Sequence, residues 1–287
     1  METIVRFGPG ARLVGILSGA GLPADAPVLV LPNAGLVPRA GPFRLHVQLA
    51  NRLAACGLRA FRFDLPGVGE SARDAGLDYR EATLAALDYL QANLRCTRFA
   101  VGGVCSAADL GWIAALSNDR VAGVMMLDGM CYAGPWYRFA RVAAALRRGP
   151  RHWFGVATRR LLRRNRTRES NRPMDIRNWP PLDRARTQMK ALLARGVRFL
   201  CIYSGGVGDY FLDTRQFGWT FGASAARDPN VRLHHWPDCD HTYFARVHRE
   251  RLLQTVITWL MEDVFPASAP QERSGAVAPP LEHEPMA

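Results

Sequence analysis

The chain has 287 residues, a length that suits one large domain, and its 37 basic and 25 acidic residues give a formal net charge of +12. No run of about 18 apolar residues occurs, which argues against a transmembrane helix. The amino terminus lacks the basic start and apolar core of a signal peptide, so we expect a cytoplasmic protein. The six cysteines show neither CxxC pairs nor metal-ligand spacing. We therefore expect reduced thiols, no metal and no cofactor.

Strand and helix signals alternate along most of the chain. An antiparallel hairpin is predicted first, from residues 4–7 and 13–17. Buried strands are then predicted at 26–31, 58–63, 99–101, 121–127, 197–203 and 231–236, and helices at 43–55, 79–93, 107–116 and 246–260. This order predicts an α/β fold with a mostly parallel central sheet that helices cover on both faces.

The segment around Cys105 has the pattern of a nucleophile elbow, a tight strand-to-helix turn of the form Gly-x-nucleophile-x-Gly. Centred on Cys105, the flanking positions are Gly103 and Ala107, both small. Centred on Ser106, one flanking position is Val104, and a β-branched residue fits such a turn poorly. We therefore assign Cys105 as the nucleophile and keep Ser106 as the alternative.

Two glycine-containing loops follow predicted strands. In the first, at 32–35, the backbone N–H of Ala34 or Gly35 is a candidate oxyanion donor, together with the N–H of Ser106. Arg39, which follows this loop, is a candidate for substrate binding. The second loop, at 64–71, lacks the Lys-Ser/Thr ending of a phosphate-binding loop, so we interpret it as a structural turn.

The remaining members of a catalytic triad are predicted in two later loops. Asp209 follows the strand at 197–203 and is the candidate orienting carboxylate, with Asp213 as the alternative. His241 follows the last strand and is the candidate base. Nucleophile, acid and histidine then occur in the chain order typical of α/β-hydrolases, each after a strand.

A basic, aromatic insertion interrupts the pattern. Residues 138–172 contain twelve arginines and one acidic residue. We predict a hydrolase core at 1–132 and 191–265, a helical cap at 133–190 and a disordered tail at 266–287. The cap is either a solvated surface, a docking site for an anionic carrier protein or phosphate-bearing acyl donor, or a membrane-surface contact. No recognition motif points to nucleic acid.

The chain from about residue 28 to 260 resembles the α/β-hydrolase superfamily, and within it bacterial hydrolases associated with exosortase and exopolysaccharide clusters. The resemblance rests on the motifs NAGL at 33–36, RFD at 62–64, GVGES at 67–71, GVCS at 103–106 and DHT at 240–242. It departs from the subgroup at Ala107, where such hydrolases usually have glycine. The cysteine at the elbow also makes the chain similar to dienelactone hydrolases and polyester synthases, so the resemblance leaves the reaction open.

These residues favour hydrolysis of an ester or thioester through an acyl-cysteine intermediate. The expected substrate is a small molecule with an acyl group, and acyl groups linked to a carrier or to CoA are included. Two alternatives remain: an acyltransferase that passes the acyl group to an alcohol or amine, and a non-catalytic binding module that uses the basic cap.

Overall fold

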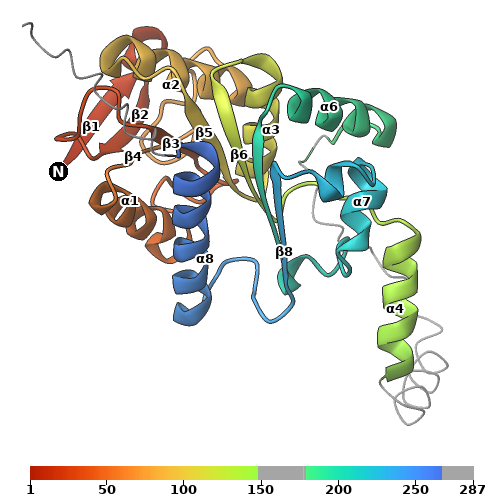
Figure 1. Cartoon of the computed structure of the whole chain (residues 1–287). Helices are drawn as coiled ribbons and strands as arrows, with labels where there is room; N and C mark the ends of the chain where they lie inside the picture. The colour runs from red at the N-terminus through yellow and green to blue at the C-terminus, as the bar shows by residue number, and fades with distance from the viewer. Residues whose placement is uncertain (148–176, 178, 267–287) are drawn as a thin grey trace, which may run out of the picture.

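The computed structural model describes residues 1–147, 177 and 179–266 of the chain (Figure 1). Its central sheet has eight strands in the order β1-β2-β4-β3-β5-β6-β7-β8. The strands are β1 (Glu2–Phe7), β2 (Leu13–Ser18), β3 (Val28–Pro32), β4 (Arg59–Phe63), β5 (Phe99–Val104), β6 (Val121–Leu127), β7 (Arg198–Ser204) and β8 (Val231–Trp236). β2 is antiparallel to its two neighbours, β1 and β4, and all other neighbouring strands are parallel.

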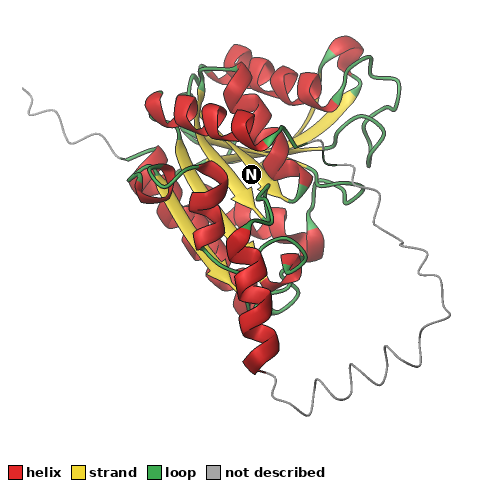
Figure 2. Ribbon diagram, turned by 90° about the vertical axis from the view of Figure 1, so that its right-hand side faces the viewer, coloured by secondary structure: helices red, strands yellow, loops and turns green. Residues whose placement is uncertain are grey.

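Helices cover both faces of the sheet (Figure 2). They are α1 (Leu45–Ala55), α2 (Tyr79–Leu94), α3 (Ser106–Ser117), α4 (Pro135–Arg147), α6 (Leu182–Ala194), α7 (Arg215–Phe221) and α8 (Arg246–Trp259). Buried side chains of α1 and α8 share one apolar core with one face of the strands. Those of α2, α3, α6 and α7 share a second core with the other face.

The strand β3 shows why the central strands are continuous apolar runs. Its residues Val28 and Val30 belong to one core, and Leu29 and Leu31 belong to the other. A parallel strand covered on both faces must be apolar at successive positions, whereas a strand with one wet face alternates. The sequence pattern predicted this two-sided burial.

Most predicted elements are confirmed to within two residues, including the hairpin of β1 and β2. The structure adds α4, α6 and α7, which the sequence analysis did not place. The predicted cap boundary at residue 190 lies inside α6, whose residues Ala185, Met189 and Leu192 are buried in the core. Most of the predicted cap (148–176 and 178) and nearly all of the predicted tail (267–287) lie outside the described residues.

The strand order positions a site at the carboxyl ends of the central strands. The chain passes from β3 to β4 on one side of β3, and β5 then lies on the other side. In open α/β sheets, the crevice at such a reversal lies at the carboxyl ends of the strands and is the usual binding position. The loop after β3 and the turn after β5 therefore meet at the carboxyl ends of these two strands.

Candidate active site

Cys105 occupies a strained turn between β5 and α3. Its backbone angles are φ 57° and ψ −119°, and the next residue, Ser106, is already the first residue of the helix. A side chain at Gly103 would place its Cβ 2.9 Å from the Cβ of Ala107, so the turn tolerates only small residues there. The strained residue of the elbow is thus Cys105 rather than Ser106, and strain of this kind typically occurs at functional sites.

His241 and Asp128 form a hydrogen-bonded pair beside the elbow. The Nδ1 of His241 lies 2.7 Å from Oδ2 of Asp128, and a carboxylate can only accept there, so Nδ1 carries the proton. Asp128 is fully buried and also accepts from the backbone N–H of Ser204 at 2.6 Å and from its hydroxyl at 2.7 Å. These donors fix the carboxylate, which in turn fixes the imidazole and leaves Nε2 for the thiol.

The structure corrects the predicted acid. The carboxylate on His241 belongs to Asp128, whereas Asp209 is exposed to solvent. After β7 the chain turns into a short 3-10 helix, Gly205–Val207, which directs Asp209 outward. The alternative, Asp213, is bound by Arg215 through two nitrogens at 2.9 and 2.6 Å.

Asp128 was missed although a signal existed. It directly follows the apolar strand β6, which lies between β5 and β7 in the sheet. An acidic residue at the carboxyl end of a buried strand is a candidate site residue on the same grounds as Asp209. Residue spacing does not indicate which of the two neighbouring loops approaches His241.

Gly206, in the loop after β7, packs closely against His241. A Cβ at Gly206 would lie 2.4 Å from the backbone nitrogen of His241 and 2.7 Å from its Cβ. Only glycine therefore allows the loop after β7 to approach the histidine so closely. The same loop is held to Ser204, whose hydroxyl accepts from the Gly206 N–H at 3.2 Å.

The Cys105 thiol is set apart from the other buried thiols by its electrostatic surroundings. Burial raises the pKa of Cys131 and of Cys239 to about 12. Burial alone would also raise the pKa of Cys105, but a hydrogen bond with His241 and the positive charge of Arg177 outweigh it and lower that pKa. The hydrogen bonds to Asp128 and Cys105 raise the pKa of His241 to about 9. The pair therefore favours a thiolate beside an imidazolium, and the two groups titrate together.

This pairing predicts how Cys105 reacts as the pH changes. In a Cys56→Ala background, which removes the exposed thiol, the rate of alkylation by iodoacetamide should rise with pH to a midpoint below 9.0, the ordinary value for a cysteine. In a His241→Ala variant the midpoint should move upward, because burial remains while the hydrogen bond and the charge are lost. Equal midpoints in the two proteins would contradict the ion pair. Turnover should fall above about pH 9, where His241 loses its proton.

Arg177 is a second residue that the sequence analysis did not single out. Its guanidinium binds both carboxylate oxygens of Asp109 on α3, at 2.5 and 2.8 Å, and stacks over the ring of Trp179 with 4.8 Å to the centroid. It also donates to the backbone carbonyl of Asp128 at 3.1 Å. Among so many arginines in the insertion, no local pattern distinguished this one.

The loop after β3 lies against the elbow, as its predicted oxyanion role requires. The N–H of Gly35 donates to the hydroxyl of Ser106 at 2.9 Å, and the carbonyl of Ala34 accepts from the N–H of Val37. Asn33 anchors the loop, because its side chain donates to the Gly35 carbonyl and accepts from the N–H of Leu65, both at 2.7 Å. Ser106 is the first residue of α3, so its N–H has no acceptor within the helix.

Arg39 has a structural position. Its guanidinium forms ion pairs with Asp64, which is fully buried, and with Glu70. Asp64 also accepts from the backbone N–H groups of Arg39 and Glu70. The arginine therefore holds the loop at 64–71 to the loop after β3, which agrees with the interpretation of 64–71 as a structural turn.

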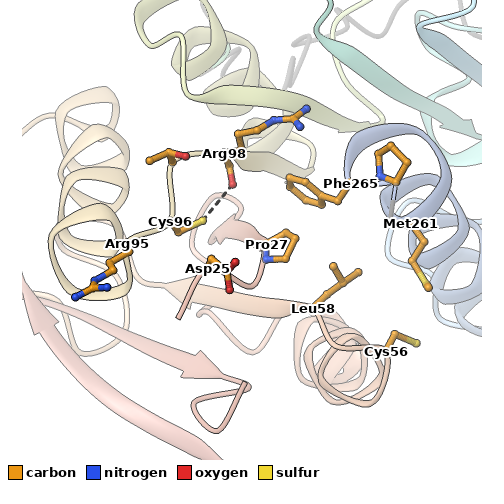
Figure 3. A pocket seen from close by; sticks show the side chains of 11 residues that line it. Asp25, Pro27, Cys56, Leu58, Arg95, Cys96, Arg98, Met261 and Phe265 are labelled. Carbon is orange, nitrogen blue, oxygen red and sulfur yellow. Dashed lines mark hydrogen bonds between the residues drawn. The ribbon is translucent and has the colours of Figure 1, made fainter. Parts of the chain in front are cut away.

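A separate cavity of about 460 Å³ lies at the opposite end of the sheet (Figure 3). Pro27, Leu58 and Arg98 line it from the positions just before β3, β4 and β5, and Met261 and Phe265 line it from the segment that follows α8. Because Cys105 follows the carboxyl end of β5, this cavity has no part in the chemistry of the elbow. Within residues 1–147, 177 and 179–266, no cluster of three or more His, Cys, Asp and Glu side chains is suited to a metal ion.

Comparisons with known proteins agree on the fold. No family model and no curated protein matches the chain. Among solved structures, an esterase from Pyrococcus furiosus superposes with a TM-score of 0.56 at 14% identity, over 92% of this chain and 91% of that one. Dienelactone hydrolase from Anabaena variabilis gives a TM-score of 0.53 at 15% identity, over 92% and 98%. A cold-adapted esterase from an Arctic intertidal metagenomic library gives 0.51 at 14%, over 92% and 93%. Together with the eight-stranded sheet and the elbow, these similarities establish that the chain has the α/β-hydrolase fold.

Proposed function

We propose that the chain is a hydrolase that cleaves an ester or thioester through an acyl-cysteine intermediate. Cys105 is the nucleophile, His241 the general base and acid, and Asp128 the residue that orients His241. The observation that carries the proposal is the hydrogen bond of 2.7 Å between His241 and the buried Asp128, next to a cysteine in the strained position of an elbow. The esterases and the dienelactone hydrolase that share the fold support the same class of reaction.

In the first half of the reaction, the thiolate of Cys105 attacks the carbonyl carbon of the substrate. The carbonyl oxygen becomes an oxyanion, and the His241 imidazolium gives its proton to the departing alcohol or thiol. The products of this half are an acyl-thioester on Cys105 and a neutral imidazole. Asp128 stabilises the charged imidazolium at the start and holds the Nε2 face toward the sulfur throughout.

In the second half, water attacks the thioester carbonyl. His241 removes a proton from this water as it attacks, and the sulfur leaves as a thiolate once the tetrahedral intermediate collapses. The free acid is released, and His241 is again an imidazolium beside the thiolate. The cycle consumes one water and needs no redox partner.

The oxyanion requires two N–H donors in this scheme. The Ser106 N–H lies at the helix start and needs no rearrangement to serve. The Gly35 N–H is bound to the Ser106 hydroxyl at 2.9 Å, so that hydroxyl must rotate away before Gly35 can donate to substrate. Each such donor contributes a factor on the order of 100 or more to the rate.

Ser106 is the weaker candidate for the nucleophile. Its hydroxyl accepts from the N–H of Gly35, and the strained backbone position of the elbow belongs to Cys105. The resemblance to hydrolases of exosortase and exopolysaccharide clusters is a finer proposal within the same fold, and the acyl group that such a protein would cleave is left to experiment.

The test is intact-mass spectrometry after brief exposure to a panel of activated acyl esters and acyl thioesters. We expect one acyl group on the protein, on the peptide that contains Cys105, with free acid as the final product. A Ser106→Ala variant should still form the adduct. An adduct that maps to Ser106 would make this a serine hydrolase, and acid joined to an added alcohol or amine would make it an acyltransferase.

A further inference from the structure

Large exposed apolar side chains concentrate at the end of the molecule that carries Cys105. Among the described residues, thirteen such side chains are exposed, and nine of them lie in segments that follow the carboxyl ends of β3, β6 and β8. These nine are Leu36, Val37, Phe43, Trp136, Phe139, Val142, Leu146, Phe244 and Val247. A concentration of this kind on a globular domain typically marks a binding surface.

One of two groups is a stripe of four side chains along α4. Trp136, Phe139, Val142 and Leu146 follow the helical spacing of three, three and four residues, so they lie along one side of the helix. Phe139, Val142 and Leu146 are 56, 59 and 68% exposed. The helix projects from the body of the protein (Figures 1 and 2), so the stripe is presented on a convex element.

Contacts near its amino end hold α4 in place. The hydroxyl of Tyr137 donates to the carbonyl of Gly208 at 3.2 Å, in the loop that packs against His241. The guanidinium of Arg215 stacks over Trp136, 4.1 Å from the ring centroid, and over Phe139 at 5.3 Å. The stripe is therefore tied to the loops of the candidate active site.

The second group holds the other five side chains and lies in the segments that follow β3 and β8. Phe43 and Phe244 pack edge to face with ring centroids 5.1 Å apart, and Arg249 lies over the Phe43 ring. Leu36, which is 85% exposed, belongs to the loop whose Gly35 contacts Ser106. The stripe on α4 follows β6, and Leu36 and Phe43 follow β3, and these two strands flank β5 in the sheet.

We propose that these nine side chains form a docking surface for an anionic lipid bilayer, called here the apolar rim. Exposed arginines accompany both groups: Arg138 and Arg141 on α4, and Arg44 beside Phe43. The whole chain carries a net charge of +12. An amphipathic helix with aromatic and aliphatic residues on one side and arginines on the other binds the headgroup region of such membranes.

Shape and charge favour a bilayer over a protein partner. A projecting helix can insert its side chains into a fluid interface, whereas a protein partner would have to supply a groove of matching shape. The same exposed basic residues complement a surface of uniformly negative charge. Among the described helices, none has the length and apolar character of a membrane span.

The docked orientation would turn the elbow toward the lipid. An acyl substrate could then reach Cys105 from the bilayer without crossing water. This consequence rests on the proposed function, while the docking itself rests only on the apolar rim and its arginines.

The experiment is co-sedimentation of the full chain with phosphatidylcholine vesicles, with and without 30% phosphatidylglycerol, at low and at moderate salt. We expect binding to the anionic vesicles that weakens with salt, and at least about tenfold weaker binding to the neutral ones. The triple variant Phe139→Ser, Val142→Ser, Leu146→Ser should bind more than about tenfold more weakly. The pair Arg138→Gln, Arg141→Gln should lose about fivefold for each arginine.

Matched controls come from the opposite parts of the surface. Ile4→Ser with Met261→Ser changes exposed apolar residues outside the rim, and Arg6→Gln with Arg95→Gln changes exposed arginines there. These controls should bind as the wild type does. Equal binding to neutral and anionic vesicles, or equal losses in rim and control variants, would overturn the proposal. Light scattering that shows a dimer for the wild type and the control variants, and a monomer only for the triple variant, would also overturn the proposal. A second copy of the chain would then cover the stripe.

Acylation of Cys105 by a water-soluble ester, measured without vesicles, separates the two proposals. The triple variant should form the adduct at the wild-type rate, because the stripe does not touch the reacting atoms. Lost vesicle binding with intact acylation therefore reports on docking alone. Absent acylation in the wild type would instead count against the proposed function.

Discussion

Replacing Cys105 by alanine is expected to lower turnover of an activated ester by at least about 10⁴-fold, since loss of a nucleophile removes the covalent route and leaves only binding and the oxyanion donors. The fold should survive, because the side chain is only half-buried and alanine is smaller than cysteine. The measurement is steady-state hydrolysis, with the thermal midpoint followed in parallel. Undiminished turnover in a folded variant would remove Cys105 from the mechanism.

Two further variants make this result specific. Cys56→Ala changes an exposed thiol at the opposite end of the sheet and should leave turnover unchanged. Ser106→Ala should retain most of the activity, because it removes a hydroxyl that occupies Gly35 and leaves the backbone N–H in place. If Ser106→Ala were inactive and Cys105→Ala active, the elbow would carry a serine nucleophile.

The elbow could be located from sequence because its constraint is local. The turn needs small residues two positions before and after the nucleophile, and Gly103 and Ala107 satisfy that need whatever surrounds them. The structure adds the backbone angles of Cys105, which place the strain on the cysteine and not on Ser106. His241 was recognisable as a histidine in the loop after the last strand.

The orienting acid could not be chosen in this way. Asp128 and Asp209 follow neighbouring strands, β6 and β7, and each stands in a loop at the same edge of the sheet. The difference between them is three-dimensional: a 3-10 turn directs Asp209 to solvent, and two hydrogen bonds from Ser204 hold Asp128 inside. Neither the 3-10 turn before Asp209 nor the hydrogen bonds from Ser204 can be predicted from the spacing of residues.

The arginines were easy to find in the sequence, but their individual roles were not. The sequence showed the basic insertion clearly, but composition alone did not separate arginines with different tasks. Arg177 is bound to Asp109 and acts on the pKa of Cys105, whereas Arg138 and Arg141 are exposed on α4. Arg39, which was predicted to face substrate, is paired with two carboxylates. Partners, and not residue type, decide what each arginine can do.

The assignment of the acid leads to the second large prediction. Asp128→Asn keeps the size of the side chain but replaces one acceptor oxygen by an NH₂ group. That NH₂ can donate to Nδ1 of His241, which stabilises the tautomer with its proton on Nε2, facing Cys105. The histidine then cannot accept the thiol proton, so turnover should fall by about 10³- to 10⁴-fold, in the range known for such a substitution in serine proteases.

The matched control is Asp209→Asn, which should stay within about twofold of the wild type because Asp209 is exposed and the carboxylate bonded to His241 is that of Asp128. A titration of the His241 ring by NMR gives a readout that does not depend on turnover. Its midpoint, at about pH 9 in the wild type, should fall in Asp128→Asn, because the hydrogen bond to the carboxylate is the largest cause of the raised pKa. Loss of activity in Asp209→Asn with a normal Asp128→Asn would restore the loop after β7 as the source of the acid. The reverse result would show that the carboxylate after β6 orients the histidine.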